Sequence, residues 1–165
     1  MDIADRKCLV VGAGPVGLRK AKTLARCGAQ VTVVSRDIPV GTGSPEADAI
    51  AWENRDYQPD DLDGVFLVFA ATDNAGLNRQ IRQDALGRQI LCNIADAPDT
   101  SDFILPSVVQ QGDLILAVST PGTSPALAKQ IRKDLEQMFG NEYAVILKVM
   151  GRIRKRMLAA GHDPK

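Results

Sequence analysis

Aromatic residues, histidine and cysteine are scarce in this sequence of 165 residues. Phe, Trp and Tyr together make up 4% of the chain, so the core must be built from aliphatic side chains. One histidine and three cysteines without a CxxC pair give no metal-binding pattern, and we expect no metal ligands. The odd number of cysteines predicts reduced thiols and a cytoplasmic protein.

Net charge and long hydrophobic segments are also missing. Lys plus Arg and Asp plus Glu number 20 each, and this balance argues against a broad basic surface for nucleic acid. No apolar run is long enough to cross a bilayer, and the charged first residues are unlike a secretory signal. We therefore expect no nucleic-acid or membrane partner, although a local basic pocket for an acidic small molecule remains compatible with zero net charge.

The first two thirds of the chain alternate short β-branched runs with helical patterns. Such alternation predicts an α/β fold, a Rossmann-type parallel sheet with helices on both faces. Gly28 is expected to end the first helix, Gly87 the second. We expect strands at residues 8–11, 31–35, 50–52, 65–71 and 90–94, and helices at residues 18–27 and 74–86.

The pattern changes near residue 97. Two apolar runs, 103–109 and 113–119, predict a pair of strands joined by a tight turn. A helix is expected after them, with Ser124 as its N-cap and Pro125 at its first position, where no amide proton is needed. An amphipathic helix at residues 141–160 is expected to follow, and its basic residues fit either a solvated face or a surface for an anionic ligand.

A GxGxxG motif follows the first expected strand and opens the first helix, as the dinucleotide fingerprint requires. Gly12 suits the tight turn, Gly14 lets the backbone approach a pyrophosphate, and Gly17 allows close packing of helix and strand. Pro15 and Val16 complete the loop at the helix N-terminus, whose dipole attracts anions. The alternative is a glycine turn without a ligand, and we favour a coenzyme site.

The ends of two other strands carry polar residues for the same site. NAD-binding folds usually place an acid at the tip of the second strand, which here reads Ser35, Arg36 and Asp37. Arg36 would favour a 2′-phosphate and Asp37 a free ribose, so the spacing leaves NAD and NADP open. Thr72 is expected to face the cleft, whereas Asp73 is expected to cap the next helix.

Asp96 follows the fourth main strand, whose carboxyl end shares an edge with the other strands. A carboxylate near the nicotinamide can accept a proton as general base. A turn-forming aspartate is an equally good interpretation of this position from spacing alone.

A series of short motifs follows in order along the chain: Val10–Gly14, Arg19–Lys20, Ala70–Asp73, Asn93–Pro98, Phe103–Ser107 and Ser119–Pro125. Together these motifs resemble precorrin-2 dehydrogenase, the N-terminal part of siroheme synthase, over about residues 3–139. The resemblance implies an oxidoreductase that converts precorrin-2 to sirohydrochlorin with NAD⁺, and some members also insert Fe²⁺ as ferrochelatases. It assigns the role of general base to Asp96 and the NAD site to Pro15, Val16, Arg36 and Asp37.

The resemblance also implies a homodimer of three-part chains. Residues 1–105 would form the NAD-binding Rossmann domain, 106–140 a dimerisation module, and 141–165 the start of a helical domain that is cut short. Two alternatives are a nucleotide-sensing module without catalysis and a structural dimer that is inactive because its helical domain is incomplete. Cations for the substrate carboxylates would come from Arg19, Lys20, Lys129 and Arg132.

Overall fold

The computed structural model describes residues 2–38, 49–95, 97–120 and 123–162. Contacts between Cα atoms divide the chain into two units, residues 1–104 and 105–165, and each is described by itself. The further division of the second unit at residue 140 stays a prediction.

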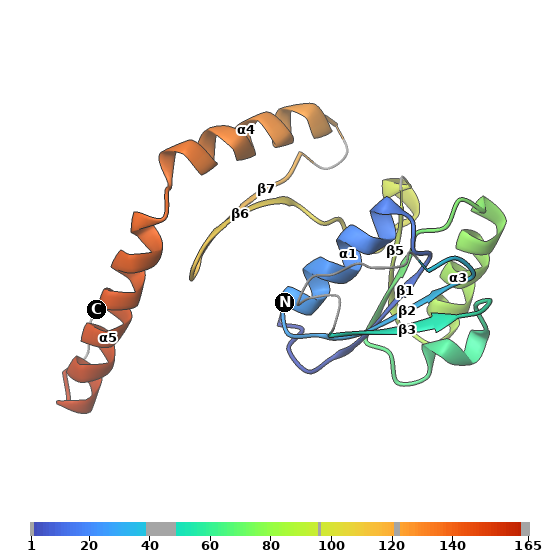
Figure 1. Ribbon diagram of the computed structural model, residues 1–165, viewed down its shortest axis with the longest axis horizontal. Helices are drawn as coiled ribbons and strands as arrows, with labels where there is room; N and C mark the ends of the chain where they lie inside the picture. The colour runs from blue at the N-terminus through green and yellow to red at the C-terminus, as the bar shows by residue number, and fades with distance from the viewer. Residues whose placement is uncertain (1, 39–48, 96, 121–122, 163–165) are drawn as a thin grey trace. The chain divides into compact units, whose positions relative to one another are not determined.

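The first unit is built on a five-stranded sheet with the order β3-β2-β1-β4-β5, and every pair of neighbours is parallel (Figure 1). The central strands are buried on both faces, which explains their continuous apolar runs. The fold class predicted from the sequence is therefore confirmed. The strands are β1 (Lys7–Val11), β2 (Gln30–Ser35), β3 (Ile50–Asn54), β4 (Leu67–Ala70) and β5 (Leu91–Ile94).

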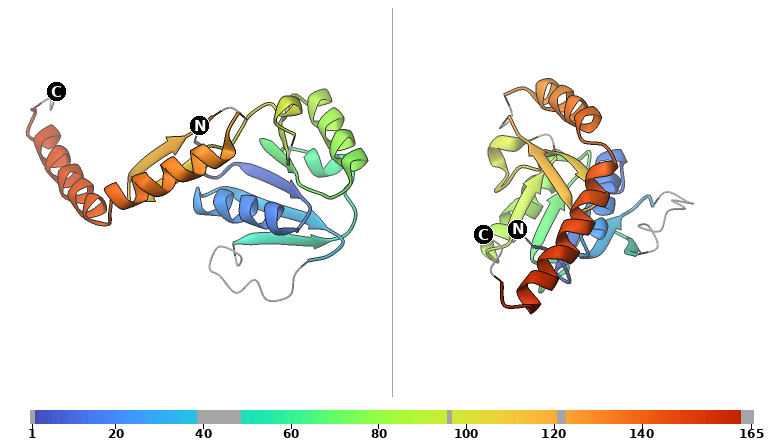
Figure 2. Two further views of the ribbon diagram at one scale, coloured as in Figure 1. Left: turned by 90° about the horizontal axis from the view of Figure 1, so that it is seen from above. Right: turned by 90° about the vertical axis from the view of Figure 1, so that its left-hand side faces the viewer.

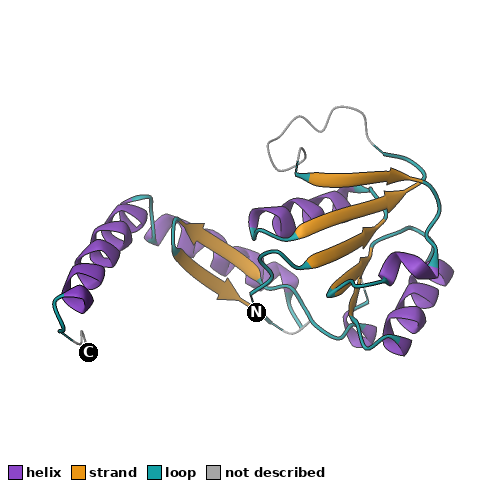
Figure 3. Ribbon diagram, turned by 90° about the horizontal axis from the view of Figure 1, so that it is seen from below, coloured by secondary structure: helices purple, strands orange, loops and turns teal. Residues whose placement is uncertain are grey.

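Two helices cover opposite faces of this sheet (Figures 1 and 3). Helix α1 (Pro15–Arg26) packs Ala21 and Leu24 on the face that includes Val10 and Phe69. Helix α3 (Ala75–Gly87) packs its buried apolar residues on the opposite face. Aliphatic side chains form most of both clusters, as the low aromatic content predicts.

The ends of the helices differ in detail from the sequence-based expectations. Helix α1 begins at Pro15, earlier than residue 18, because proline is well suited to a first helical position. The assignment of Asp73 as the cap of α3 is wrong: the Asn74 side chain accepts the hydrogen bond from the Leu77 N–H. Gly87 is the last helical residue of α3, and the positive φ that follows belongs to Gln89.

Two short 3-10 turns lie among the described residues of the first unit. Turn η1 (Pro59–Leu62) lies between β3 and β4, and η2 (Pro98–Thr100) follows β5. Leu62 of η1 is fully buried against the α3 side of the sheet.

The described residues of the second unit form a hairpin and two helices (Figure 2). Strands β6 (Ser107–Gln111) and β7 (Leu114–Val118) are antiparallel, and β6 begins later than expected. Helix α4 (Pro125–Met138) packs on one face of this hairpin and is capped by Ser124, whose hydroxyl accepts from the Leu127 N–H. Helix α5 (Glu142–Ala159) follows. Among the described residues, no helix combines the length and apolar character needed to cross a membrane.

Candidate coenzyme-binding site

The carboxyl ends of three strands meet at the glycine turn. The Gly12 N–H donates to the Val34 carbonyl at 2.9 Å, and the Ala71 N–H donates to the Val11 carbonyl at 2.8 Å. The turn after β1 is thus held between the ends of β2 and β4. The chain continues from β1 to β2 on one side, whereas β4 lies on the other, which makes this edge the topological switch point where open α/β sheets bind ligands.

The glycines of this turn have different surroundings. Gly12 has φ +103°, and a Cβ added to it would lie 2.4 Å from the Ala71 carbonyl oxygen. A Cβ on Gly17 would lie 2.0 Å from the carbonyl oxygen of Gly12, so both positions require glycine here. Gly14, by contrast, is exposed, and no described atom comes within 4 Å of its hypothetical Cβ. The turn is closed on the protein side and open where a pyrophosphate would approach.

The N-terminus of α1 supplies the electrostatic attraction at this opening. Pro15 is exposed and Val16 half-buried, and the first turn of the helix contains no acidic residue. The unpaired N–H groups and the partial positive charge of a helix N-terminus favour a bound phosphate. These residues therefore fit a dinucleotide, as the motif predicts.

The tip of β2 carries the second predicted group. The Ser35 hydroxyl donates to the Asp37 carbonyl at 3.2 Å. Arg36 forms a bidentate pair with Asp56, donating from Nε to Oδ1 and from Nη2 to Oδ2 at 3.0 Å. This hydrogen-bonded pair lowers the pKa of Asp56 and raises that of Arg36. Asp56, which follows β3, was not singled out from the sequence.

Thr72 lies half-buried just after β4. Its hydroxyl donates to Oδ1 of Asn78 at 2.7 Å. Asn78 was missed by the sequence analysis, although a polar residue on the buried face of an expected helix was the signal available.

Asp96 lies outside the described residues, and its place beside the nicotinamide stays a prediction. The residues on either side of it are held by hydrogen bonds. The Ala95 N–H donates to the Ala70 carbonyl at 2.9 Å. The Ser101 hydroxyl accepts from the Ile94 N–H at 2.9 Å and donates to the Ala97 carbonyl at 2.9 Å. Ala95 therefore lies at the end of β5, beside the end of β4.

The side chain of Lys20 on α1 is held by a hydrogen bond and by an aromatic ring. Its ammonium donates to Oδ1 of Asn93 at 2.8 Å and lies 4.6 Å from the centroid of the Phe69 ring. Asn93 is buried and donates from Nδ2 to the Phe103 carbonyl at 2.7 Å. Of the other expected cations, Arg132 forms an ion pair with Glu136 on its own helix.

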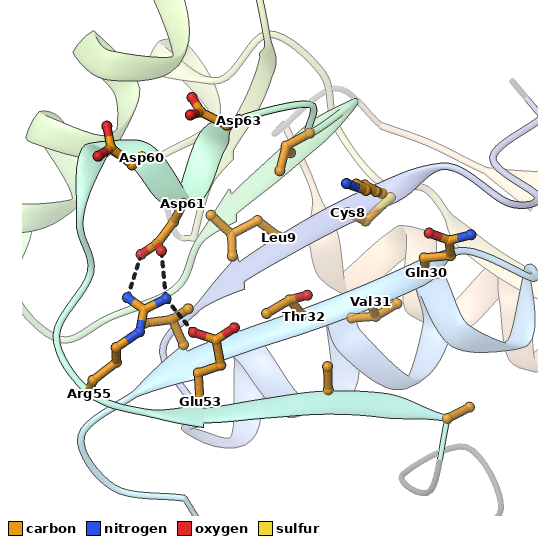
Figure 4. A pocket seen from close by; sticks show the side chains of 15 residues that line it. Cys8, Leu9, Gln30, Val31, Thr32, Glu53, Arg55, Asp60, Asp61 and Asp63 are labelled. Carbon is orange, nitrogen blue, oxygen red and sulfur yellow. Dashed lines mark hydrogen bonds and ion pairs between the residues drawn. The ribbon is translucent and has the colours of Figure 1, made fainter.

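A cavity of about 540 Å³ lies over β1–β3, on the sheet face opposite α1 (Figure 4). None of the predicted coenzyme residues lines it. Arg55 is held there between Glu53 and Asp61. Burial acts to raise the pKa of Asp61, but hydrogen bonds from Arg55 and the Gln58 N–H outweigh it and lower that pKa. The carboxylates around this cavity would repel a pyrophosphate.

The part of the chain that the structure describes contains no group of three or more His, Cys, Asp or Glu side chains that could hold a metal ion.

A parallel sheet with a glycine turn at its switch point defines a Rossmann-type dinucleotide-binding domain. The chain belongs to the family described as putative NAD(P)-binding, whose model matches residues 1–107. The model described as sirohaem biosynthesis protein central matches residues 111–138. The family resemblance inferred from the sequence motifs is confirmed.

Individual relatives agree with this assignment. The chain is 41% identical over 144 residues to a siroheme synthase from Methylobacillus flagellatus, covering 87% of this chain and 31% of the relative. It is 37% identical over 156 residues to siroheme synthase from Escherichia coli, covering 94% of this chain and 34% of the relative. The chain thus spans about a third of the length of these curated relatives.

A solved structure, SirC, precorrin-2 dehydrogenase, is similar to this one with a TM-score of 0.76 and 28% sequence identity. The match covers 93% of this chain and 76% of that chain.

Proposed function

We propose that this chain is an NAD-dependent precorrin-2 dehydrogenase that acts in siroheme biosynthesis. The observation that carries the proposal is the open glycine turn at the sheet's switch point, in a chain similar to SirC over 93% of its length. The siroheme synthase relatives support the same pathway.

The residues of the chain have separate tasks in this reaction. Gly12, Gly14 and the N-terminus of α1 bind the pyrophosphate and fix the direction of the coenzyme. Bound NAD⁺ supplies the acceptor for the hydride that leaves the macrocycle. Asp96 accepts the proton lost as the ring system becomes more oxidised. Alignment of the reactants contributes most of the acceleration, up to about 7–11 kcal/mol in well-oriented systems.

The proposal is tested by mixing the protein with precorrin-2 and NAD⁺ and following absorbance in the NADH band. We expect NADH and sirohydrochlorin in equal amounts. Tight NAD⁺ binding without turnover would instead indicate a nucleotide-sensing module. An extended chain carrying the following helical region of a siroheme synthase relative provides the control, because activity restored only there would indicate an incomplete substrate site.

The charges at the tip of β2 favour NAD⁺ over NADP⁺. Two carboxylates, Asp37 and Asp56, accompany the single guanidinium of Arg36, and a 2′-phosphate would have to compete with Asp56 for it. Asp56→Asn is expected to raise the ratio of kcat/KM for NADP⁺ to that for NAD⁺. The change should be about two- to fivefold, since exposed ion pairs are weak and the side chains of Arg36 and Asp56 are 77% and 64% exposed.

This preference is measured from initial rates with each coenzyme at low and high salt. The shift should shrink at high salt, because screening weakens exposed charges. A ratio that does not change at either ionic strength would contradict the assignment of Arg36 and Asp56 to the ribose end of the site.

The proposal includes a homodimer formed through the hairpin of the second unit. Ile115 is 62% exposed and Val108 43% exposed on the hairpin face opposite the buried Val109, and a two-stranded sheet is marginal alone. Ile115→Lys should shift sedimentation toward the monomer, because the charge would be buried in the interface. Leu86→Lys, at a position 63% exposed on α3, is the control; a dimer unaffected by Ile115→Lys would contradict this surface.

Two finer points complete the proposal. Fe²⁺ would be a second substrate for insertion into sirohydrochlorin, tested by the spectral change on adding Fe²⁺ under anaerobic conditions. The cytoplasm is the proposed location, in accord with reduced cysteines in the sequence: the free Cys8 and Cys92 are buried.

A further inference from the structure

Asn78 of α3 forms three hydrogen bonds with Thr72, the second residue after the end of β4. The Thr72 N–H donates to Asn78 Oδ1 at 3.2 Å, and the Thr72 hydroxyl donates to the same oxygen at 2.7 Å. In the other direction, Asn78 Nδ2 donates to the Thr72 carbonyl at 3.0 Å. The oxygen and the nitrogen of the Asn78 amide both form hydrogen bonds. Asn78 therefore holds the N–H, the carbonyl and the hydroxyl of Thr72.

Asn78 is a polar residue on the buried face of α3. Only 7% of Asn78 is exposed, and it shares the buried face of α3 with Ile81 and Ala85. An apolar residue would normally occupy such a place, since burying an amide is unfavourable unless it is fully hydrogen-bonded. All the side-chain bonds that the structure gives Asn78 go to Thr72, which is only half-buried.

The backbone of Thr72 lies close to the glycine turn. A Cβ on Gly12 would lie 2.4 Å from the Ala71 carbonyl oxygen and 3.0 Å from the Thr72 nitrogen. The backbone at residues 71–72 therefore leaves no room for a side chain at Gly12. The Ala71 N–H also donates to the Val11 carbonyl at 2.8 Å, while the Gly12 N–H donates to the Val34 carbonyl on the other side. A shift of Thr72 would be transmitted to the turn, because the residue before Thr72 is hydrogen-bonded to the residue before Gly12.

We propose that Asn78 is a positioning residue of the coenzyme site, which holds Thr72 and through it the phosphate-binding turn in the geometry that binds NAD. The inference rests on the proposed function. Asn78 acts through Thr72, and its effect falls on coenzyme affinity and not on the chemical step.

The test compares Asn78→Leu, which keeps the approximate volume and removes all three bonds, with wild type. The dissociation constant of NADH, followed by the coenzyme's fluorescence, should rise about tenfold. In the dehydrogenase assay the KM for NAD⁺ should rise similarly, while kcat at saturating NAD⁺ stays within about twofold. Asn78→Asp, which keeps the acceptor and loses the donor, should also weaken NADH binding and serves if the leucine variant does not fold.

Tyr57→Phe is the matched control, because it removes a hydrogen bond to the same helix at a different place, from the Tyr57 hydroxyl to Asp84 at 3.1 Å. Urea unfolding should show both variants destabilised, but only the Asn78 variants should lose NADH affinity. Equal affinity for NADH in wild type and the Asn78 variants, or an equal loss in Tyr57→Phe, would overturn the positioning role alone. A wild-type protein that binds no NADH would overturn the proposed function together with it.

Discussion

Replacing Asp96 with alanine is expected to lower kcat for precorrin-2 oxidation by about 10²–10⁴-fold, the range for loss of a general base. The dissociation constant of NAD⁺ should stay unchanged, because the coenzyme is held by the glycine turn and the N-terminus of α1. The N–H of Ala95, the residue before Asp96, donates to the Ala70 carbonyl at 2.9 Å, and Ala71 borders Gly12. Ala95 thus lies at the edge where the coenzyme is proposed to bind.

Stopped-flow or steady-state NADH formation measures this effect, with NADH fluorescence giving the affinity. Asp99→Ala is the matched control, because Asp99 is an exposed carboxylate in the adjacent turn η2. Wild-type turnover in Asp96→Ala would remove Asp96 from the mechanism.

Gly12→Ala is expected to abolish measurable NAD⁺ binding and to lower the free energy of unfolding by at least about 2 kcal/mol. Two costs add at this position. A φ of +103° is strained for any residue with a side chain, and the new Cβ would lie 2.4 Å from the Ala71 carbonyl oxygen. The backbone must move to relieve the contact, and the movement displaces the start of α1 from its place at the phosphate site.

Gly14→Ala gives a control in the same loop that separates folding from binding. Gly14 has φ −67°, which alanine adopts without strain, and its Cβ would enter space open among the described residues. We expect unfolding free energy close to wild type in urea, but weaker NAD⁺ binding, because the methyl group occupies the approach of the pyrophosphate. If Gly12→Ala bound NAD⁺ like wild type, the coenzyme site would have to lie elsewhere.

The order of elements and the location of the glycine turn were predictable because they depend on neighbours in sequence. Short β-branched runs specify buried strands, and apolar spacing specifies helices, whatever the rest of the chain does. Pro125 and its capping residue Ser124 marked the start of α4 correctly for the same local reason. At α3 two adjacent residues could each have capped the helix, and the backbone geometry chose Asn74 over Asp73.

The sequence by itself determined the fold class, the dinucleotide fingerprint and the family, since all three are carried by local patterns and contiguous motifs. Only the tertiary structure decided three pairings. Arg36 pairs with Asp56, Lys20 is hydrogen-bonded to Asn93, and Asn78 of α3 is hydrogen-bonded to Thr72. Arg36 and Asp56 are 20 positions apart in the sequence, and Lys20 and Asn93 are 73 positions apart. Both pairs become neighbours through the parallel strand order. Periodicity reports whether a side chain is buried, but its partner depends on which strand lies beside it.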